Sequence, residues 1–332
     1  MTAPPTYLAI DGGNSKTHVV IGDGTGRVLG FAHGPGSSPH YLGVAGSIEL
    51  LDGLVGQALA EAGRPPDTVL DRAEVYIAGA DLPLEVDVLT KAVGEAGWAR
   101  EYRVDNDLFA LLRAGTSNPD AVAVVCGAGI NCVGRSTDGR TSRFPSLGNI
   151  SGDWGGGHHL AELALWHAAR GEDGRGPATA LTAAVAAHFG RATVEEVSAG
   201  LHLGELDKQR IRDLSPVLFA VAAAGDPVAR RVVAKQAHEV VALATIAARR
   251  LDMLDRPHAV VLGGGVLAIR HPLLHEAVLA GIREAAPLAT IGIVADPPVA
   301  GAALLALDAF GAATPEVEAT VRAALGTAIA DQ

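Results

Sequence analysis

The chain opens with short apolar runs that are separated by glycine-rich turns. Residues 7–10 have the pattern of a buried strand, residues 17–21 that of a β-rich return, and residues 27–32 that of a third strand. This spacing predicts three adjacent antiparallel strands. Gly12 and Gly13 lie at the first turn, where we expect a hairpin that needs a positive φ and a close approach of the backbone.

Helical and strand patterns then alternate along the chain. Apolar residues recur at helical spacing over residues 44–62, 82–97 and 108–114, and short strand patterns occupy residues 73–79 and 102–105. Three strands followed by helix, strand, helix and strand are typical of an α/β layer with a mixed sheet.

The opening pattern is repeated in the second part of the chain. Residues 121–125 form a near-continuous apolar strand that runs into a glycine turn, and residues 133–135 form its return. The repeat indicates a duplicated hairpin fold that faces itself across a cleft. We expect the loop at residues 115–119 to link a first domain, residues 1–117, to a larger second domain, residues 118–332.

The rest of the second domain is mostly helical in pattern. We predict helices over residues 161–169, 178–189, 194–201, 211–224, 227–251, 273–285 and 298–310, and strands over residues 258–262 and 291–294. The tail after residue 312 has only a weak helical pattern, and we predict no element there.

Composition narrows the class of protein. At 332 residues the chain exceeds the usual size of one core, which favours two domains. A net charge of -11 argues against a nucleic-acid or anionic-membrane surface and favours a small substrate. No apolar run of about 18 residues lacks charge or glycine, so we expect no membrane span. Cys126 and Cys132 cannot form a disulfide framework, and the N-terminus has no signal pattern, so we expect a cytoplasmic protein.

The first glycine turn offers groups that suit a polyanion. Backbone N–H groups in such a turn bind phosphate oxygens, and Asp11 at the strand end can hold a hydrated Mg²⁺. Lys16 either adds positive charge to the phosphates or is a solvated turn lysine. The alternative for the whole turn is an ordinary Gly-Gly hairpin with a solvated aspartate.

Three strand-then-glycine turns, at residues 11–17, 127–131 and 263–266, resemble in order and spacing the phosphate and adenosine segments of the actin, hexokinase and heat-shock-chaperone ATPase superfamily. Residues 152–160 (Gly-Asp-Trp-Gly-Gly-Gly-His-His-Leu) resemble the Gly-Asp-Glu-Gly-Ser-Gly/Ala signature of N-acetylglucosamine kinases and the related activator ATPases (BadF/BadG/BcrA/BcrD-type). Asn106-Asp107, followed by an apolar helix and an Ala-Gly pair, is similar to the same family.

The resemblance implies an α/β protein of two ribonuclease H-like (actin/hexokinase-type) domains with mixed five-stranded sheets around a central cleft. Whether the helix at residues 298–310 returns to the first domain is left open by the sequence. The resemblance also implies ATP as cofactor, with Mg²⁺ placed through water by Asp11. The nucleotide would be held by the residues of the three turns: Gly12, Gly13, Asn14, Ser15, Lys16, Thr17, Gly127, Ala128, Gly129, Gly263, Gly264 and Gly265.

Asp107 is the candidate general base, because a carboxylate at a strand end can accept the proton of a sugar hydroxyl, and the family has its base here. Asp105 is the rival. Strand alternation sends both carboxylates to one face if the strand continues that far, so geometry does not choose between them. The structural alternative for Asp107 is a helix N-cap before Leu108.

Sugar ligands are also implied by the resemblance. Besides Asp107 and its neighbour Asn106, they include Asn131, Asp153 and His158. Asn131 could instead be a left-handed turn residue, and Asp153 a helix cap.

Three further residues bear on the sugar pocket. We favour His158 and His159 as ring-stacking or hydrogen-bonding groups over a metal pair, because adjacent positions point apart and no third ligand lies at metal spacing. Asp81 could contact the substrate, but we expect it to cap the next helix. Trp154 replaces the family's usual Glu, which leaves open the choice between glucosamine and N-acetylglucosamine.

The residues and the resemblance together predict an amino-sugar kinase that uses ATP and Mg²⁺ and acts on the 6-hydroxyl of D-glucosamine, which is slightly preferred, or N-acetyl-D-glucosamine. The resemblance alone implies a homodimer. Carboxylates at Asp81, Asp105, Asp107 and Asp153 support the preference, because they suit an ammonium at C2. One alternative is an activator ATPase, which needs cysteines that hold an iron–sulfur cluster at a dimer interface. The other is a sugar-sensing regulator, which would need a DNA-binding domain that we do not expect ahead of a strand beginning near residue 7.

Overall fold

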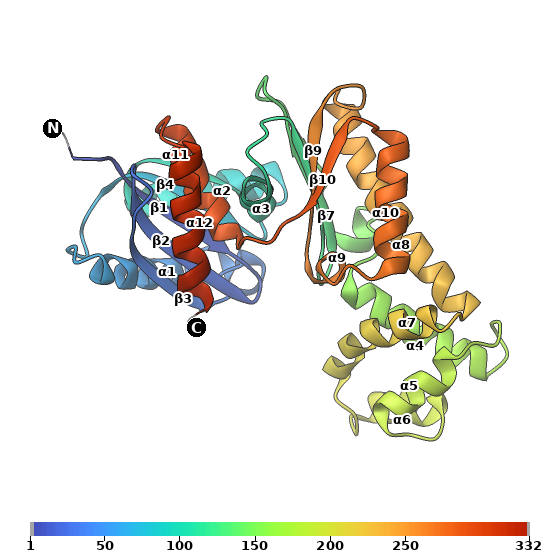
Figure 1. The fold of residues 1–332 in the computed structure, drawn as a ribbon. Coiled ribbons are helices and arrows are strands. Elements are labelled where there is room, and N and C mark those ends of the chain that lie inside the picture. The colour runs from blue at the N-terminus through green and yellow to red at the C-terminus, as the bar shows by residue number, and fades with distance from the viewer. Residues whose placement is uncertain (1–2, 331–332) are drawn as a thin grey trace. The chain divides into compact units, whose positions relative to one another are not determined.

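The computed structural model describes residues 3–330 and contains two five-stranded sheets. The chain divides into two compact units. Unit 1 consists of Met1–Ala123, Val133–Pro145 and Val294–Gln332, and unit 2 of Val124–Cys132 and Ser146–Ile293. Unit 1 therefore combines the beginning of the chain with its end, the blue and red segments that lie side by side in Figure 1.

The first sheet has the strand order β3-β2-β1-β4-β5. Its strands are β1 (Thr6–Gly12), β2 (Lys16–Asp23), β3 (Val28–Pro35), β4 (Leu70–Ile77) and β5 (Ala99–Asn106). The first three pair antiparallel, and β1, β4 and β5 pair parallel. This mixed sheet confirms the predicted order of three antiparallel strands followed by crossover connections.

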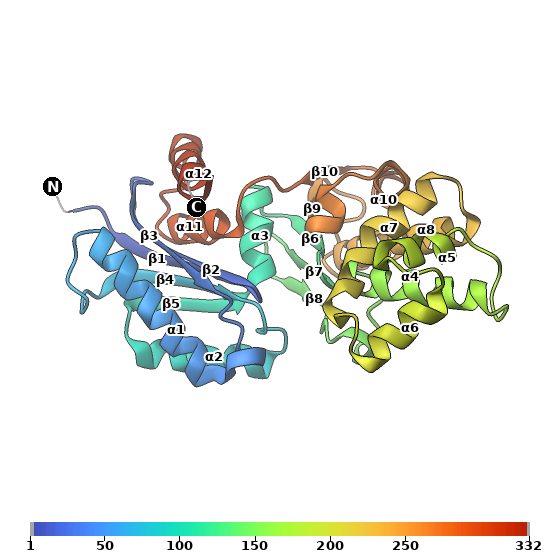
Figure 2. The same ribbon diagram turned by 90° about the horizontal axis from the view of Figure 1, so that it is seen from below.

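Helices cover both faces of the first sheet (Figure 2). On one face lie α1 (Pro39–Glu61) and α2 (Pro83–Ala96), and on the other lie α11 (Pro298–Ala309) and α12 (Pro315–Ala330), with α3 (Asp107–Gly115) packed against α11. The α3 and α11 backbones approach closely, since a Cβ added to Gly301 would lie 1.8 Å from the carbonyl oxygen of Ala110.

Among the described helices, α1 alone is long and apolar enough to cross a membrane by length and composition. A core helix of a globular protein meets the same criterion. Leu51, Leu54 and Leu59 of α1 are buried in the core of unit 1, where the helix packs on β2 and β3. Packing against the sheet accounts for the apolar face of α1.

Helix α12 was not predicted, because its local apolar pattern is weak. Long-range contacts hold it in place. Val321 and Leu325 are fully buried, and the buried guanidinium of Arg113 donates to Glu318 at 2.5 Å and to Asp308 of α11 at 2.7 Å. The ion pairs join α3, α11 and α12, which no local pattern reveals.

The second sheet has the strand order β10-β9-β6-β7-β8. Its strands are β6 (Ala121–Cys126), β7 (Ile130–Arg135), β8 (Thr141–Arg143), β9 (His258–Gly263) and β10 (Ala289–Ile293). Strands β9 and β10 pair parallel, whereas β7 and β8 pair antiparallel, so this sheet is also mixed. The short strand β8 was not predicted.

The helices of unit 2 follow the predicted order with shifted ends, except that the short helix α9 was not predicted. They are α4 (Gly157–Glu172), α5 (Leu181–Phe189), α6 (Val194–Leu203), α7 (Leu214–Ala223), α8 (Pro227–Arg250), α9 (Gly265–Ala268) and α10 (Pro272–Ala285). Short 3₁₀ segments occupy Gly148–Ile150 and Lys208–Asp213. Helix α8 packs against α10 and α7, and α4 packs against α5 and α7.

Candidate active site

The first glycine turn joins β1 to β2. Asp11 and Gly12 are the last residues of β1 and pair with His18 and Thr17. The N–H of Gly13 donates to the carbonyl oxygen of Lys16 at 2.9 Å and closes the turn. The tip of the hairpin, residues 14–16, is exposed to solvent. It is therefore accessible to a ligand.

The predicted reason for the two glycines is only half right. Neither Gly12 nor Gly13 has a positive φ. Close approach is the reason for both, because an added Cβ would lie 2.6 Å from Ser37 Oγ at Gly12 and 2.9 Å from the carbonyl oxygen of Lys16 at Gly13.

Thr17 differs from its neighbours in the turn. Its side chain is fully buried, and its hydroxyl lies 2.8 Å from the carbonyl oxygen of Pro35 and 2.9 Å from Ser37 Oγ. The hydroxyl of Thr17 therefore secures the hairpin to the loop that follows β3.

Asp11 has the chemistry of a magnesium ligand. Its side chain is buried and its Oδ2 lies 3.7 Å from Nδ1 of His18, a buried atom with no hydrogen-bond partner in the described chain. Carboxylate oxygen suits Mg²⁺, which binds proteins through one or two carboxylates plus water and phosphate. The position therefore fits a metal that accompanies phosphate.

Asn106 and Asp107 mark the change from strand to helix. Asn106 ends β5 and caps α3, because its Oδ1 accepts from the N–H of Leu108 at 3.0 Å. Its Nδ2 donates to Asp81 Oδ1 at 2.8 Å. The N-cap is thus Asn106, and the alternative that placed Asp107 there is wrong. Both ends of the Asn106 amide bind protein groups, so its side chain positions this turn.

The structure separates the two rival carboxylates. The strand ends at Asn106, so alternation does not continue to Asp107. Asp105 is 4% exposed and is bound by Arg143 at 2.5 Å and Arg103 at 3.2 Å. The half-buried Asp107 has no ion-pair partner within residues 3–330. Asp107 is therefore the carboxylate that can accept a proton.

The surroundings of Asp107 raise its pKa to about 7. Burial is the largest cause, followed by the negative charges of Asp11 and Asp81. Both causes disfavour the ionised carboxylate. A base with a pKa near the working pH combines a useful ionised fraction with the basicity to take a hydroxyl proton.

The substitution Asp81→Asn is expected to move the acidic limb of the kcat/KM profile to lower pH. Removing a negative charge near Asp107 lowers the pKa of Asp107, so the base stays ionised in more acidic solution. Profiles at saturating ATP between about pH 5.5 and 8.5 measure the shift. Asp87→Asn, an exposed change on α2, the helix that follows Asp81, is the control and should leave the profile in place. If the acidic limb of the Asp81→Asn profile does not move, that limb does not report the ionisation of Asp107.

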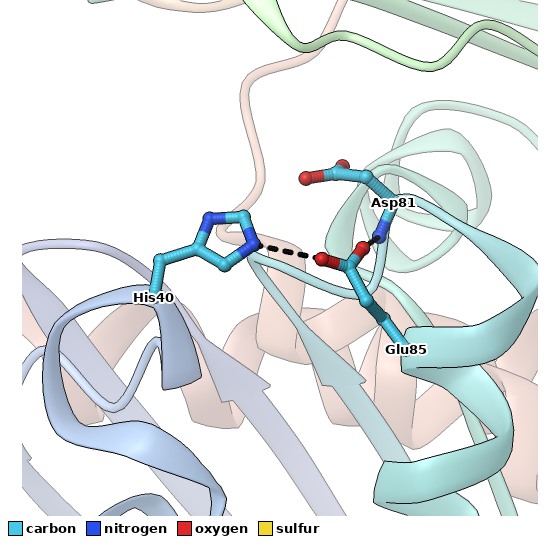
Figure 3. A group of neighbouring side chains, drawn as sticks. All are labelled: His40, Asp81 and Glu85. Carbon is cyan, nitrogen blue, oxygen red and sulfur yellow. Dashed lines mark hydrogen bonds and ion pairs between the residues drawn. The ribbon is translucent and has the colours of Figure 1, made fainter.

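Asp81 also belongs to a group with His40 and Glu85 at the start of α2 (Figure 3). Glu85 Oε2 accepts from the N–H of Leu82 at 2.8 Å and of Asp81 at 3.0 Å, and its Oε1 lies 3.1 Å from His40 Nε2. Glu85 therefore caps α2, and the expectation that Asp81 does so is wrong. The Asp81 carboxylate instead orients Asn106. These contacts give the group a structural role.

The second glycine turn joins β6 to β7 and rests on the start of α4. The carbonyl oxygen of Gly127 accepts from the N–H of Gly157 at 2.7 Å, and that of Ala128 from the N–H of His158 at 3.0 Å. The N–H groups of Ala128 and Gly129 donate to no group in the described part of the chain. Two backbone donors are thus available to an anion.

The third glycine turn packs directly on the second. Gly264 has φ +85°, and a Cβ on it would lie 2.5 Å from the carbonyl carbon of Cys126 and 2.7 Å from the N atom of Gly127. Its neighbour Gly265 begins α9, is exposed, and would place a Cβ in open space. The two turns therefore form one glycine surface in unit 2.

A pocket of about 350 Å³ opens beside this surface. Residues of its lining that were predicted for the site are Ala128, Gly129, Asp153, His158 and His159. Ile130 and Gly155 lie within the predicted motifs at 127–131 and 152–160, and the unpredicted residues are Ser146, Gly148, Asn149 and Glu162. Most of the unpredicted residues belong to the loop that precedes α4. No local pattern distinguishes them, because the fold alone brings them together.

The structure rules out the alternative roles of two predicted sugar ligands, Asp153 and Asn131. Asp153 Oδ2 accepts from Ser151 Oγ at 2.7 Å and from the N–H of Gly148 at 3.0 Å, while Gly156 precedes α4. Asp153 is therefore not the helix cap. Asn131 lies in β7 without a positive φ and accepts from the N–H of Cys132 at 2.6 Å, so it is not a left-handed turn residue. It is outside the lining of the pocket.

The two histidines use their rings in different ways. The N–H of Gly155 donates to Nδ1 of His159 at 3.0 Å. The ring of His159 packs edge-on against Trp154 at 5.0 Å. Burial and the charge of Arg212 lower the pKa of His158, so its ring is neutral at pH 7. Both histidines line the pocket, and His158 offers it an uncharged hydrogen-bonding group.

A long-range contact supports the loop that precedes α4. Gln236 of α8 is fully buried, and its Oε1 accepts from the N–H of Gly156 at 3.0 Å. Sequence reasoning missed Gln236, because it lies far along the chain in an ordinary helical pattern.

Comparison with known proteins adds to this geometry. The model of the BadF/BadG/BcrA/BcrD ATPase family matches residues 8–306. The chain is 26% identical over 317 residues to an N-acetyl-D-glucosamine kinase of Dictyostelium discoideum, covering 91% of this chain and 98% of that protein. It is 25% identical over 260 residues to an N-acetylmuramic acid/N-acetylglucosamine kinase of Clostridium acetobutylicum, covering 78% and 85%.

Solved structures share the fold. A candidate N-acetylglucosamine kinase from Chromobacterium violaceum superposes with a TM-score of 0.67 at 21% identity, covering 91% of this chain and 99% of that one. A ROK hexokinase from Thermus thermophilus gives a TM-score of 0.54 at 20% identity, covering 90% and 97%. The predicted fold class, with two mixed five-stranded sheets, is confirmed.

Proposed function

Because the chain belongs to the BadF/BadG/BcrA/BcrD ATPase family, we propose that it is an ATP-dependent kinase that phosphorylates the 6-hydroxyl of a hexosamine, N-acetylglucosamine or glucosamine. Asp107 is the observation that carries the proposal. It is a carboxylate with a pKa of about 7, is held at the start of α3 by the Asn106 cap, and has no cationic partner among the described residues.

Asp107 acts as general base in this proposal. Its carboxylate accepts the proton of the sugar hydroxyl while the hydroxyl oxygen forms a bond to the γ-phosphorus. The bond from that phosphorus to the oxygen bridging to the β-phosphate breaks, and ADP leaves with the electron pair. The proton ends on Asp107.

Backbone donors carry much of the phosphate binding in this proposal. The N–H groups of Ala128 and Gly129 and the exposed tip at residues 14–16 offer donors and the charge of Lys16. Asp11 would hold Mg²⁺, which neutralises phosphate charge when bound. The open backbone at Gly265 suits the adenosine.

The choice of sugar rests on the residues of the pocket in unit 2. Asp153 and the neutral His158 supply acceptors and donors for hydroxyls. The slight preference for glucosamine was based on four carboxylates that could bind an ammonium group. One of them, Asp105, is bound by Arg103 and Arg143. Its charge is thus unavailable to an ammonium at C2. Since both curated relatives are named for N-acetylglucosamine, this sugar is the first to test.

A sugar panel with ATP tests the proposal. We expect ADP formation that requires sugar, with kcat/KM for N-acetylglucosamine or glucosamine at least about tenfold above that for glucose, since a pocket built around C2 loses contacts with an unsubstituted analogue. The 6-deoxy analogue of the better substrate is the matched control and should give no phosphorylated product. ATP hydrolysis that ignores every sugar would contradict the proposal and favour the activator ATPase.

The activator alternative finds no support in the two thiols. Cys126 and Cys132 are both fully buried, and burial raises the pKa of Cys126 to about 12 and that of Cys132 further. Cluster ligands must be thiolates near a shared interface. The use of Mg²⁺, the homodimer and the cytoplasmic location stay predictions, to be tested by metal dependence, light scattering and fractionation.

A further inference from the structure

A second pocket, of about 160 Å³, lies in unit 1. None of its residues is assigned to ATP or to the sugar. Its lining comes from β4, β5, β7, β8, α3, α11 and the turn that joins β7 to β8. Three of the lining side chains are arginines, Arg103, Arg135 and Arg140.

Arg135 is the unusual member of this group. Its Nε is buried without a hydrogen-bond partner, and its guanidinium makes one long contact, 3.4 Å, to the carbonyl oxygen of Asn118. No carboxylate of the described chain lies within ion-pair distance of it. A half-buried guanidinium without a counter-ion is costly unless a ligand supplies one.

Neighbouring charges also act on Arg135. Burial and, after it, the positive charge of Arg113 lower the pKa of Arg135, and the negative charge of Asp308 partly offsets them. Arg103 pairs with Asp105 at 3.2 Å and Arg140 pairs with Asp138 at 2.8 Å. These two arginines therefore have carboxylate partners, whereas no carboxylate of the described chain pairs with Arg135.

The other walls limit the size of the ligand. Phe109 and Leu305 supply apolar surface, and the hydroxyl of Tyr76 is turned to Glu74 at 2.8 Å. At about 30 Å³ for each water, the volume holds on the order of five waters. A phosphoryl group with a short carbon stem fits, and a whole nucleotide does not.

We propose that this pocket binds the phosphoryl group of inorganic phosphate or of a small phosphomonoester, with Arg135, Arg103 and Arg140 as its ligands. Guanidinium groups recognise phosphate oxygens through paired N–H donors, which makes a cluster of three a specific anion site. The lining shares no residue with the glycine turns, so its occupancy does not depend on the proposed kinase activity.

Calorimetry and thermal unfolding of the full chain test the site, with inorganic phosphate in one arm and glucosamine 6-phosphate in the other. We expect both Arg135→Gln and Arg140→Gln to weaken binding about tenfold or more, because each removes charged hydrogen bonds. Arg140 is half exposed, so its variant should fold even if Arg135→Gln does not. The arm with the lower Kd identifies the source of the phosphoryl group.

Arg175→Gln is the matched control, since Arg175 pairs with Asp173 two residues before it, as Arg140 pairs with Asp138, but lies in unit 2. It should bind phosphate as the unaltered protein does. If the pocket variants also bind as tightly as the unaltered protein, the anion sits on the glycine turns and the proposal is wrong. Absence of binding in both arms would overturn it as well.

Discussion

Replacing Asp107 with Asn is expected to stop turnover and, at the same time, to raise the stability of the fold. An amide cannot accept the hydroxyl proton, so kcat should fall by about a hundredfold or more, while nucleotide binding is kept. The amide also removes a carboxylate that burial and two negative neighbours oppose. Active sites often carry such a cost in stability.

The pH dependence of the stability gain follows from the difference between the pKa of Asp107 in the folded protein and its pKa in the unfolded protein. In the folded protein the pKa of Asp107 is about 7, against 3.8 for an unperturbed aspartate. Between these values the folded state binds more protons than the unfolded state, so its stability falls as pH rises from about 4 to 7 and is constant above. The Asn variant avoids this loss, and we expect a gain of about 2 kcal/mol at pH 8 for a partly solvated side chain.

Thermal unfolding at pH 5 and pH 8, with turnover measured on the same samples, checks both effects. The difference in Tm between Asp107→Asn and the unaltered protein should be larger at pH 8. Asp67→Asn, an exposed change in the same unit, is the control and should alter neither quantity. Full activity of the Asp107→Asn variant would show that Asp107 is not the general base.

The same substitution at two adjacent glycines should lower the stability of the fold at one and leave it unchanged at the other. Gly264→Ala adds a Cβ 2.5 Å from the backbone of Cys126 at a φ of +85°. Overpacking and left-handed strain together cost about 3 kcal/mol. We expect a lower urea midpoint and weakened ATP binding, since the third turn can no longer rest on the second.

Gly265→Ala is the matched partner, because its Cβ meets nothing within 4 Å and its φ is not in the left-handed region. Its urea midpoint should not change. If adenosine lies on this backbone, the KM for ATP should still rise about tenfold. Equal urea midpoints for the two variants would show that the turns do not touch, and an unchanged KM in Gly265→Ala would move the adenosine elsewhere.

The strands and glycine turns were predictable because they rest on local chemistry. Apolar runs of strand length followed by glycine mark a hairpin whatever the rest of the chain does. The reason why glycine is needed at each position was not predictable. At Gly12 the reason is Ser37, a residue 25 positions away, whose close approach leaves no room for a side chain.

The parts that sequence reasoning missed depend on partners far along the chain. Alternation could not choose between Asp105 and Asp107, because the choice depends on where β5 ends and on Arg143 of another strand. Helix α12 lacks a strong apolar stripe and needs Arg113, which is 205 positions before Glu318. Asp81 looked like a cap because nothing local shows that Asn106 donates to it.

Even a small chemical change at Asn106 would disrupt this turn. Its oxygen faces the N–H of Leu108 and its NH₂ faces the carboxylate of Asp81, so the amide has only one workable orientation. Deamidation with age would exchange that NH₂ for an oxygen, with loss of ammonia, and set two acceptors against each other. The added anion would also make the neighbouring base harder to ionise, so a stored preparation would decline first in mildly acidic buffer.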